Sequence, residues 1–138
     1  MKKLIILLLA AFVLPVVASA QQSSKIQQAF TQEEIEAIVT QDPNEMAFLE
    51  YMADRAANVR TMNGDISAMP EISELNALKK NASIPDVNAD NFNVETFNPL
   101  AYNLDIENTV YQFRLGNTNQ VVQILSENRT RHLFDSGQ

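Results

Sequence analysis

The chain has 138 residues, a formal net charge of −7 at pH 7 and no cysteine. This length suffices for one ordinary domain with a modest core. The lack of cysteine excludes disulfides, thiol chemistry and cysteine-ligated metals. The acidic balance argues against nucleic acid as a partner, because phosphates would be repelled.

The first twenty residues have the pattern of a bacterial secretory signal peptide. Two lysines precede a nearly unbroken apolar run at 4–17, and Ala18-Ser19-Ala20 offers small residues to a signal peptidase. The run is shorter than the ~20 residues that span a bilayer, and Pro15 interrupts it. We therefore expect cleavage, export of residues 21–138 to the periplasm or the medium, and no stable membrane anchor.

Two helices are expected next. Thr31 and Glu34 have capping-box spacing, which predicts a helix to about Gln41. Asp42 is a good N-cap, and apolar residues then recur at three- and four-residue steps up to residue 59. This pattern predicts an amphipathic helix of about seventeen residues.

The middle of the chain is less regular. Apolar residues spaced by three predict a third, shorter helix over 70–80. Residues 81–98 are rich in Asn and Asp, which is typical of an ordered loop or linker. We consider short strands at three places, 92–94, 100–104 and 130–134.

Residues 110–126 predict a β-hairpin, because two apolar-rich runs flank the polar stretch Gly116-Asn117-Thr118-Asn119. Side chains alternate along a strand, so one register collects the bulky residues on one face. That register has three facing pairs: Leu115 with Gln120, Phe113 with Val122, and Tyr111 with Ile124. The charge is uneven as well, since residues 21–107 carry five basic and fifteen acidic side chains, whereas 108–138 carry three and two.

Helices first and strands last indicate an α+β fold. We expect two or three N-terminal helices packed on a small C-terminal antiparallel sheet built around the 110–126 hairpin. The helix that ends at residue 59 is the natural cover for the apolar face of the hairpin. Residues 21–138 would then form a single small domain.

A calcium loop is the strongest motif with a chemical role, and it is incomplete. Asp86, Asn88 and Asp90 have the alternate spacing of oxygen ligands. The sixth position holds Asn91 where glycine is expected, and the twelfth holds Phe97 where glutamate is expected. The competing interpretation is a polar loop whose Asn and Asp side chains bond their own backbone.

Catalytic signatures are weak. His132 is the only histidine, and the sequence has no Gly-x-Ser-x-Gly elbow. Carboxylates are plentiful, but there is no tryptophan to line a sugar-binding cleft. We predict no catalytic residue and no required cofactor, with calcium as the one candidate.

The second face of the hairpin is a candidate partner surface, because it mixes aliphatic, amide and cationic side chains. It comprises Val110, Gln112, Arg114, Val121, Gln123 and Leu125. A protein partner could dock there or pair with an open strand edge. The alternative is that another element of the chain covers this face.

These observations favour a small exported, non-enzymatic protein that binds a protein or another component of the bacterial cell envelope. The alternative is a small exported hydrolase that uses carboxylates, with or without calcium.

Overall fold

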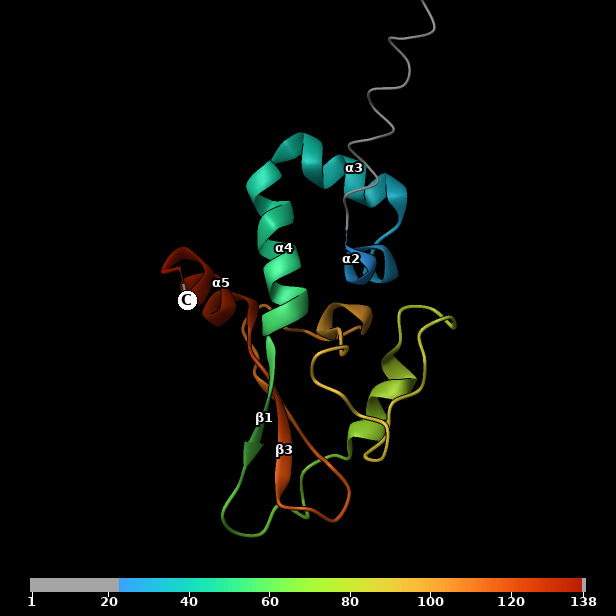
Figure 1. Cartoon of the computed structure of the whole chain (residues 1–138), viewed down its shortest axis with the longest axis vertical. Coiled ribbons are helices and arrows are strands. Elements are labelled where there is room, and N and C mark those ends of the chain that lie inside the picture. Colours follow the sequence, from blue (N-terminus) through green and yellow to red (C-terminus); the bar gives the residue numbers. More distant parts are fainter. Residues whose placement is uncertain (1–22, 138) are drawn as a thin grey trace, which may run out of the picture.

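The computed structural model describes residues 23–137 and shows an α+β fold. The expected signal peptide, residues 1–20, lies outside the described residues. In Figure 1 the N-terminal helices lie above a three-stranded antiparallel sheet, with α5 on one side and η1 with its loops on the other. In chain order the elements are α2 (Ser24–Ala29), α3 (Gln32–Gln41), α4 (Pro43–Arg55), β1 (Ala57–Thr61), the 3₁₀ helices η1 (Ile72–Leu78) and η2 (Pro99–Ala101), β2 (Tyr111–Arg114), β3 (Gln120–Ile124) and α5 (Glu127–Asp135).

The predicted helix starts are confirmed in atomic detail. Thr31 Oγ1 accepts a hydrogen bond from Glu34 N at 3.2 Å, and Thr31 N donates to Glu34 Oε2 at 2.7 Å. Asp42 Oδ1 caps α4 by accepting from Asn44 N at 2.9 Å, and Pro43 occupies the first helical position. Among residues 23–137, no helix is long and apolar enough to cross a membrane.

The prediction that the second helix continues to residue 59 is wrong. Helix α4 ends at Arg55, and the chain continues as the edge strand β1. Residues 58–61 are Asn, Val, Arg and Thr, all but Arg poor helix formers, and pairing with β3 satisfies their backbone instead. The helix was predicted too long because Val59, which lies beyond the end of α4, has the spacing of the apolar residues on that helix.

The hairpin prediction is confirmed, including its register. Tyr111 faces Ile124 and Phe113 faces Val122, and Leu115 N donates to Gln120 O at 3.0 Å. Strand β3 lies between β1 and β2, so it is paired on both sides. Gly116 begins the turn at φ = 60°, where a side chain is disfavoured, and an added Cβ would lie 3.2 Å from Ala89 Cβ.

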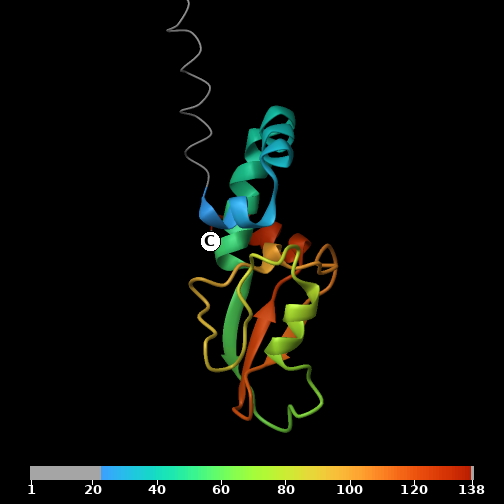
Figure 2. The ribbon, with the colours of Figure 1, turned by 90° about the vertical axis from the view of Figure 1, so that its right-hand side faces the viewer.

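The apolar face of the sheet is not covered by α4, contrary to expectation. Phe113, only 5% exposed, packs with η1 and with residues of the 84–102 segment. Ile72 and Leu75 of η1 contribute to this cluster, and their spacing of three suits a 3₁₀ helix, in which residues i and i+3 lie above one another. The predicted helix over 70–80 is therefore present as a 3₁₀ helix. Figure 2 shows η1 in front of the strands.

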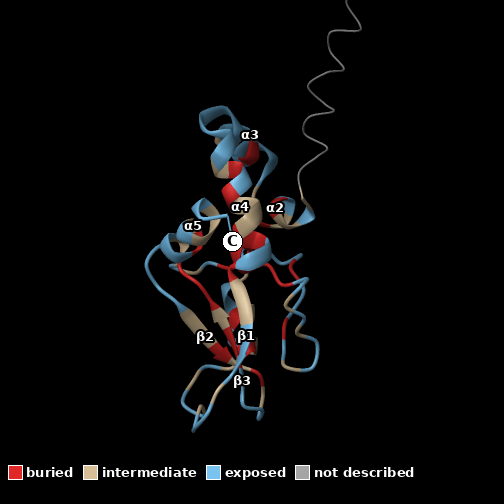
Figure 3. Cartoon of the chain, turned by 60° about the vertical axis from the view of Figure 1, so that its left-hand side comes forward, coloured by how far each residue is buried: buried red, intermediate tan, exposed pale blue. Residues whose placement is uncertain are grey.

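Helix α4 belongs to a second apolar cluster with α2 and α3. Phe48 and Met52 are its largest buried residues on α4, and Leu100 reaches it from η2. Figure 3 shows buried residues along β3 and the inner side of α4, whereas α3 is largely exposed. The 99–101 turn thus contributes side chains to both clusters, because Ala101 packs on the sheet side.

The three short strands proposed elsewhere do not form. Residues 92 and 93 have no regular structure and residue 94 begins a turn, while 100–104 contain the end of η2 and a single bridge between Tyr102 and Lys79. Residues 130–134 lie in α5, which begins after Ser126, whose Oγ accepts from Arg129 N at 3.3 Å. A cap of this kind favours a helix over a further strand.

Asn98, 3% exposed, ties α2 to the 84–102 segment. Its Nδ2 donates to Lys25 O at 2.8 Å and to Gln28 Oε1 at 3.1 Å, and its Oδ1 accepts from Leu100 N at 3.2 Å. Each partner would be left unsatisfied by truncation.

We expect Asn98→Ala to lower the free energy of unfolding by about 1–3 kcal/mol in urea denaturation, because buried polar groups lose their partners. Asn117→Ala, in the exposed hairpin turn, is the matched control and should change it little. Equal losses in the two variants would contradict the role given to Asn98.

Candidate functional site

The six residues predicted as a partner surface do not form one exposed face. Val121 is fully buried and Leu125 is buried as well. Val110, 41% exposed, reaches the solvent, while Gln112, Arg114 and Gln123 are half-buried. The part of this face that remains accessible is thus mainly amide and cationic.

Arg114 is held by the chain itself. Its Nη1 lies 2.7 Å from Glu71 Oε2 and donates to Gly116 O at 3.0 Å, while its Nε donates to Met69 O at 2.9 Å. Glu71 Oε1 also accepts from Gly116 N at 3.0 Å. This network joins the start of η1 to the hairpin, so the cation that seemed available to a partner serves the fold.

The two sheet edges differ. On β2, Arg114 N donates to Pro70 O at 2.9 Å, so part of that edge is occupied. On β1, Leu125 N donates to Ala56 O and Met62 N donates to Asn119 O. In an antiparallel pair every second residue bonds to the partner strand, so the even-numbered residues from 56 to 62 face β3. The backbone N–H and C=O groups of Ala57, Val59 and Thr61 therefore point away from β3. A shallow groove beside Ala57 and Val59 also involves Tyr51 and Glu95.

The proposed calcium ligands engage the chain rather than one another. Asp86 Oδ1 lies 2.6 Å from Lys79 Nζ. Asn88 Oδ1 accepts from Asp90 N at 2.9 Å and from Asn91 N at 3.0 Å, which is an Asx turn. Among residues 23–137, no group of three or more His, Cys, Asp or Glu side chains is placed to hold a metal ion.

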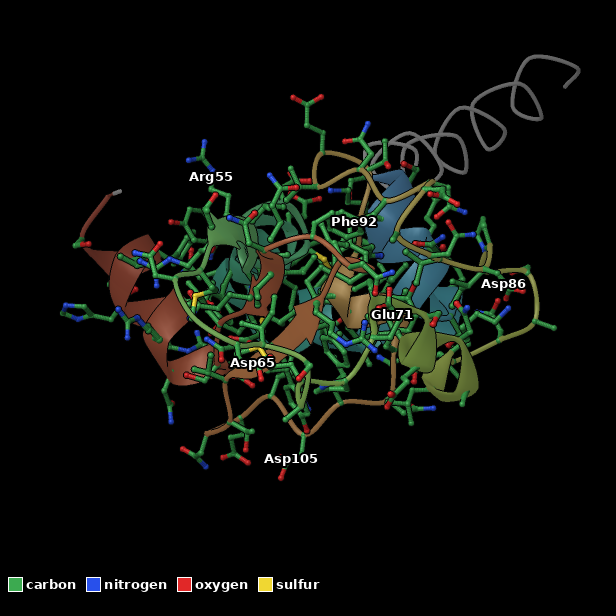
Figure 4. All side chains as sticks on the ribbon, turned by 90° about the horizontal axis from the view of Figure 1, so that it is seen from below. Arg55, Asp65, Glu71, Asp86, Phe92 and Asp105 are labelled. Atoms are coloured by element: carbon green, nitrogen blue, oxygen red, sulfur yellow. The ribbon has the colours of Figure 1, made fainter. Side chains whose placement is uncertain are left out.

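A pocket of about 250 Å³ opens between α2 and the 84–102 segment. Its floor is apolar and aromatic, and its rim is polar. Phe92 packs on Phe97 with ring centroids 5.3 Å apart, and Phe97 stacks on Tyr102 at 5.6 Å. Figure 4 shows Asp86 at the outer edge of its loop and Phe92 nearer the centre of the molecule. The polar side chains that line the pocket are Gln28, Asp86, Asn91, Asn93, Thr96, Asn98 and Tyr102.

Tyr102 is the distinctive residue of this pocket. It is only 6% exposed, and no hydrogen bond joins its hydroxyl to another residue within 23–137. Burial raises the pKa of Tyr102, and the negative charge of Asp86 raises it further. The hydroxyl therefore stays protonated at neutral pH and can donate a hydrogen bond.

The acidic and basic side chains of α3 and α5 do not line this pocket. His132 is exposed on α5, near the end of the described chain. Of the two glutamates in the first turn of α3, Glu33 and Glu34, Glu34 forms the capping box, and its hydrogen bonds with Thr31 lower the pKa of its carboxyl. The described residues thus offer a pocket suited to binding, with a single carboxylate at its rim.

This pocket was not predicted from the sequence. A signal was present, because two aromatic residues, Phe92 and Phe97, fall within the Asn-rich segment 81–98 and a third, Tyr102, follows it closely. Such a pattern indicates a loop with an apolar side to bury. It does not indicate where that side leaves a cavity.

Comparisons with protein-family models, curated proteins and solved structures find no match to this chain.

We expect Glu71→Ala to lower the free energy of unfolding by about 1–3 kcal/mol in urea denaturation, because Arg114 loses its acidic partner and Gly116 N loses its acceptor. Glu107→Ala removes an exposed carboxylate of the same type and should have little effect. A Glu71 variant as stable as this control would contradict the network.

We expect millimolar calcium to leave the melting temperature unchanged relative to chelator. Binding at Asp86, Asn88 and Asp90 would have to break the Lys79 pair and the Asx turn, and a ligand of the native state must raise the melting temperature. An increase that Asp90→Asn abolishes would restore the calcium hypothesis.

Proposed function

We propose that this chain is a small exported, non-enzymatic binding protein of the bacterial cell envelope, and that the pocket between α2 and the 84–102 segment is its binding site. The observation that carries the proposal is Tyr102, a buried residue of the pocket lining whose hydroxyl bonds to no other residue within 23–137. A polar group left without a protein partner in such a position calls for an explanation, and a bound ligand supplies one.

The form of the pocket favours binding over catalysis. General acid/base chemistry needs two titratable groups within reach of one substrate, and among residues 23–137 Asp86 is the only charged side chain that lines the pocket. Its carboxylate is already paired with Lys79. Aromatic rings with a few polar groups at the rim are the usual composition of a small-molecule site.

Export is proposed from the sequence pattern of residues 1–20. Cell fractionation tests it separately from binding, because a protein confined to the cytoplasm would contradict the envelope location whatever its pocket holds.

Binding is tested by equilibrating the purified protein with a small-molecule extract of the envelope fraction, washing it, and identifying released compounds by mass spectrometry. We expect one compound to be enriched by the native protein and lost in Thr96→Trp, which places a bulky ring at the rim. Thr40→Trp is the matched control, because Thr40 is an exposed threonine on α3, likewise bonded to a preceding carbonyl.

Retention of the compound by Thr96→Trp would contradict the assignment of the site. Release of a chemically altered compound by the native protein would contradict the non-enzymatic function and favour the alternative of a carboxylate-dependent hydrolase.

A further inference from the structure

Three of the polar side chains that line the pocket have a donor that the described chain does not use. The Tyr102 hydroxyl, Gln28 Nε2 and Asn93 Nδ2 donate to no other residue within 23–137. The oxygens of the two amides are occupied, since Gln28 Oε1 accepts from Asn98 Nδ2 and Asn93 Oδ1 from Glu95 N. A suitable ligand therefore presents several acceptor oxygens.

The charge of the lining selects against an ion. Among residues 23–137, no Lys, Arg or His lines the pocket, so an anionic ligand would lack a counter-charge there and would meet Asp86 at the rim. A cation would have to compete with Lys79, whose Nζ lies 2.6 Å from Asp86 Oδ1 and also donates to Ile84 O at 3.0 Å. Burying an unpaired charge is costly, so the ligand is neutral.

The apolar floor and the volume of the pocket further restrict which ligands fit. Phe92 is half-buried and continues the aromatic series of Phe97 and Tyr102, so it offers an apolar surface to a ligand. The volume of about 250 Å³ is below the range usual for drug-sized ligands, which leaves room for about one six-membered ring with its substituents.

We propose that the pocket binds one neutral cyclic polyol of monosaccharide size, whose hydroxyl oxygens accept hydrogen bonds from Tyr102, Gln28 and Asn93 and whose C–H face packs on Phe92. This inference rests on the proposed binding function. A sugar hydroxyl can both accept from the phenol and donate to Asp86 or to a backbone carbonyl, and a pyranose ring has an apolar face that suits an aromatic side chain.

The test is isothermal titration calorimetry of the purified protein with glucose, galactose, mannose, N-acetylglucosamine and myo-inositol, and with glucosamine and glucuronate as charged analogues. We expect at least one neutral compound to bind, and its charged counterpart to bind at least tenfold more weakly. Equal affinity for a neutral sugar and its charged analogue would overturn the proposal.

Two variants test the assigned contacts. Tyr102→Phe should weaken binding of the neutral ligand about tenfold, because one hydrogen bond is lost. Its melting temperature should not fall, because the hydroxyl bonds to no other residue within 23–137. Tyr111→Phe is the matched control, since its hydroxyl accepts from Asp105 N at 3.0 Å outside the pocket, and it should keep full affinity. Unchanged affinity in Tyr102→Phe would overturn the assignment.

The experiment with the envelope extract distinguishes a wrong ligand class from a wrong binding function. If none of the five neutral compounds binds but the native protein still enriches an extract compound that Thr96→Trp loses, the ligand class is wrong and the binding function stands. If neither experiment gives binding, both are wrong.

Discussion

A small three-stranded sheet must bury its apolar face, and here an irregular segment buries it. Phe113, Val122 and Ile124 are covered by η1 and by residues between 84 and 102, without a long helix. Such a segment has few partners for its own backbone, yet buried backbone groups must be paired. Asparagine side chains supply those partners. Asn76 alone accepts from Val87 N at 2.8 Å and donates to Val87 O at 2.9 Å, which imitates a pair of ladder hydrogen bonds. The high Asn content of this region thus has a structural cause.

Two lysines fasten the same segment to the rest of the fold. Lys79 Nζ donates to Ile84 O, and Lys25 Nζ donates to Glu95 O at 3.0 Å and to Ala53 O at 3.3 Å. Each ammonium also has an acidic partner, Asp86 for Lys79 and Asp54 for Lys25. In an acidic chain with few cations, these contacts combine charge neutralisation with satisfaction of loop carbonyls. They hold α2, the end of α4 and the loop together around the pocket.

Features that depend on neighbouring residues, such as helix caps and the hairpin register, were predicted correctly from the sequence. The capping box at Thr31, the cap at Asp42 and the hairpin register all depend on neighbouring residues or on strict alternation, and all three are confirmed. Errors arose where distant partners decide the structure. Val59 fits a helical stripe, but pairing with β3 makes it part of a strand. The cover of the sheet was assigned to the longest helix, whereas Ile84, Val87 and Phe97 supply it from a segment without periodicity. The pocket could not be predicted at all, because it depends on how that segment meets α2.

The irregular cover also explains why a cavity exists beside the sheet. A helix lays a continuous ridge of side chains on a sheet, whereas turns built from Asx motifs direct successive side chains in different directions and leave spaces between them. In this protein one such space is lined by Tyr102, whose ring packs on Phe97 and whose hydroxyl bonds to no other residue within 23–137. The ring accounts for the packing of Tyr102, and the hydroxyl is the part of this side chain that the proposed binding function would use.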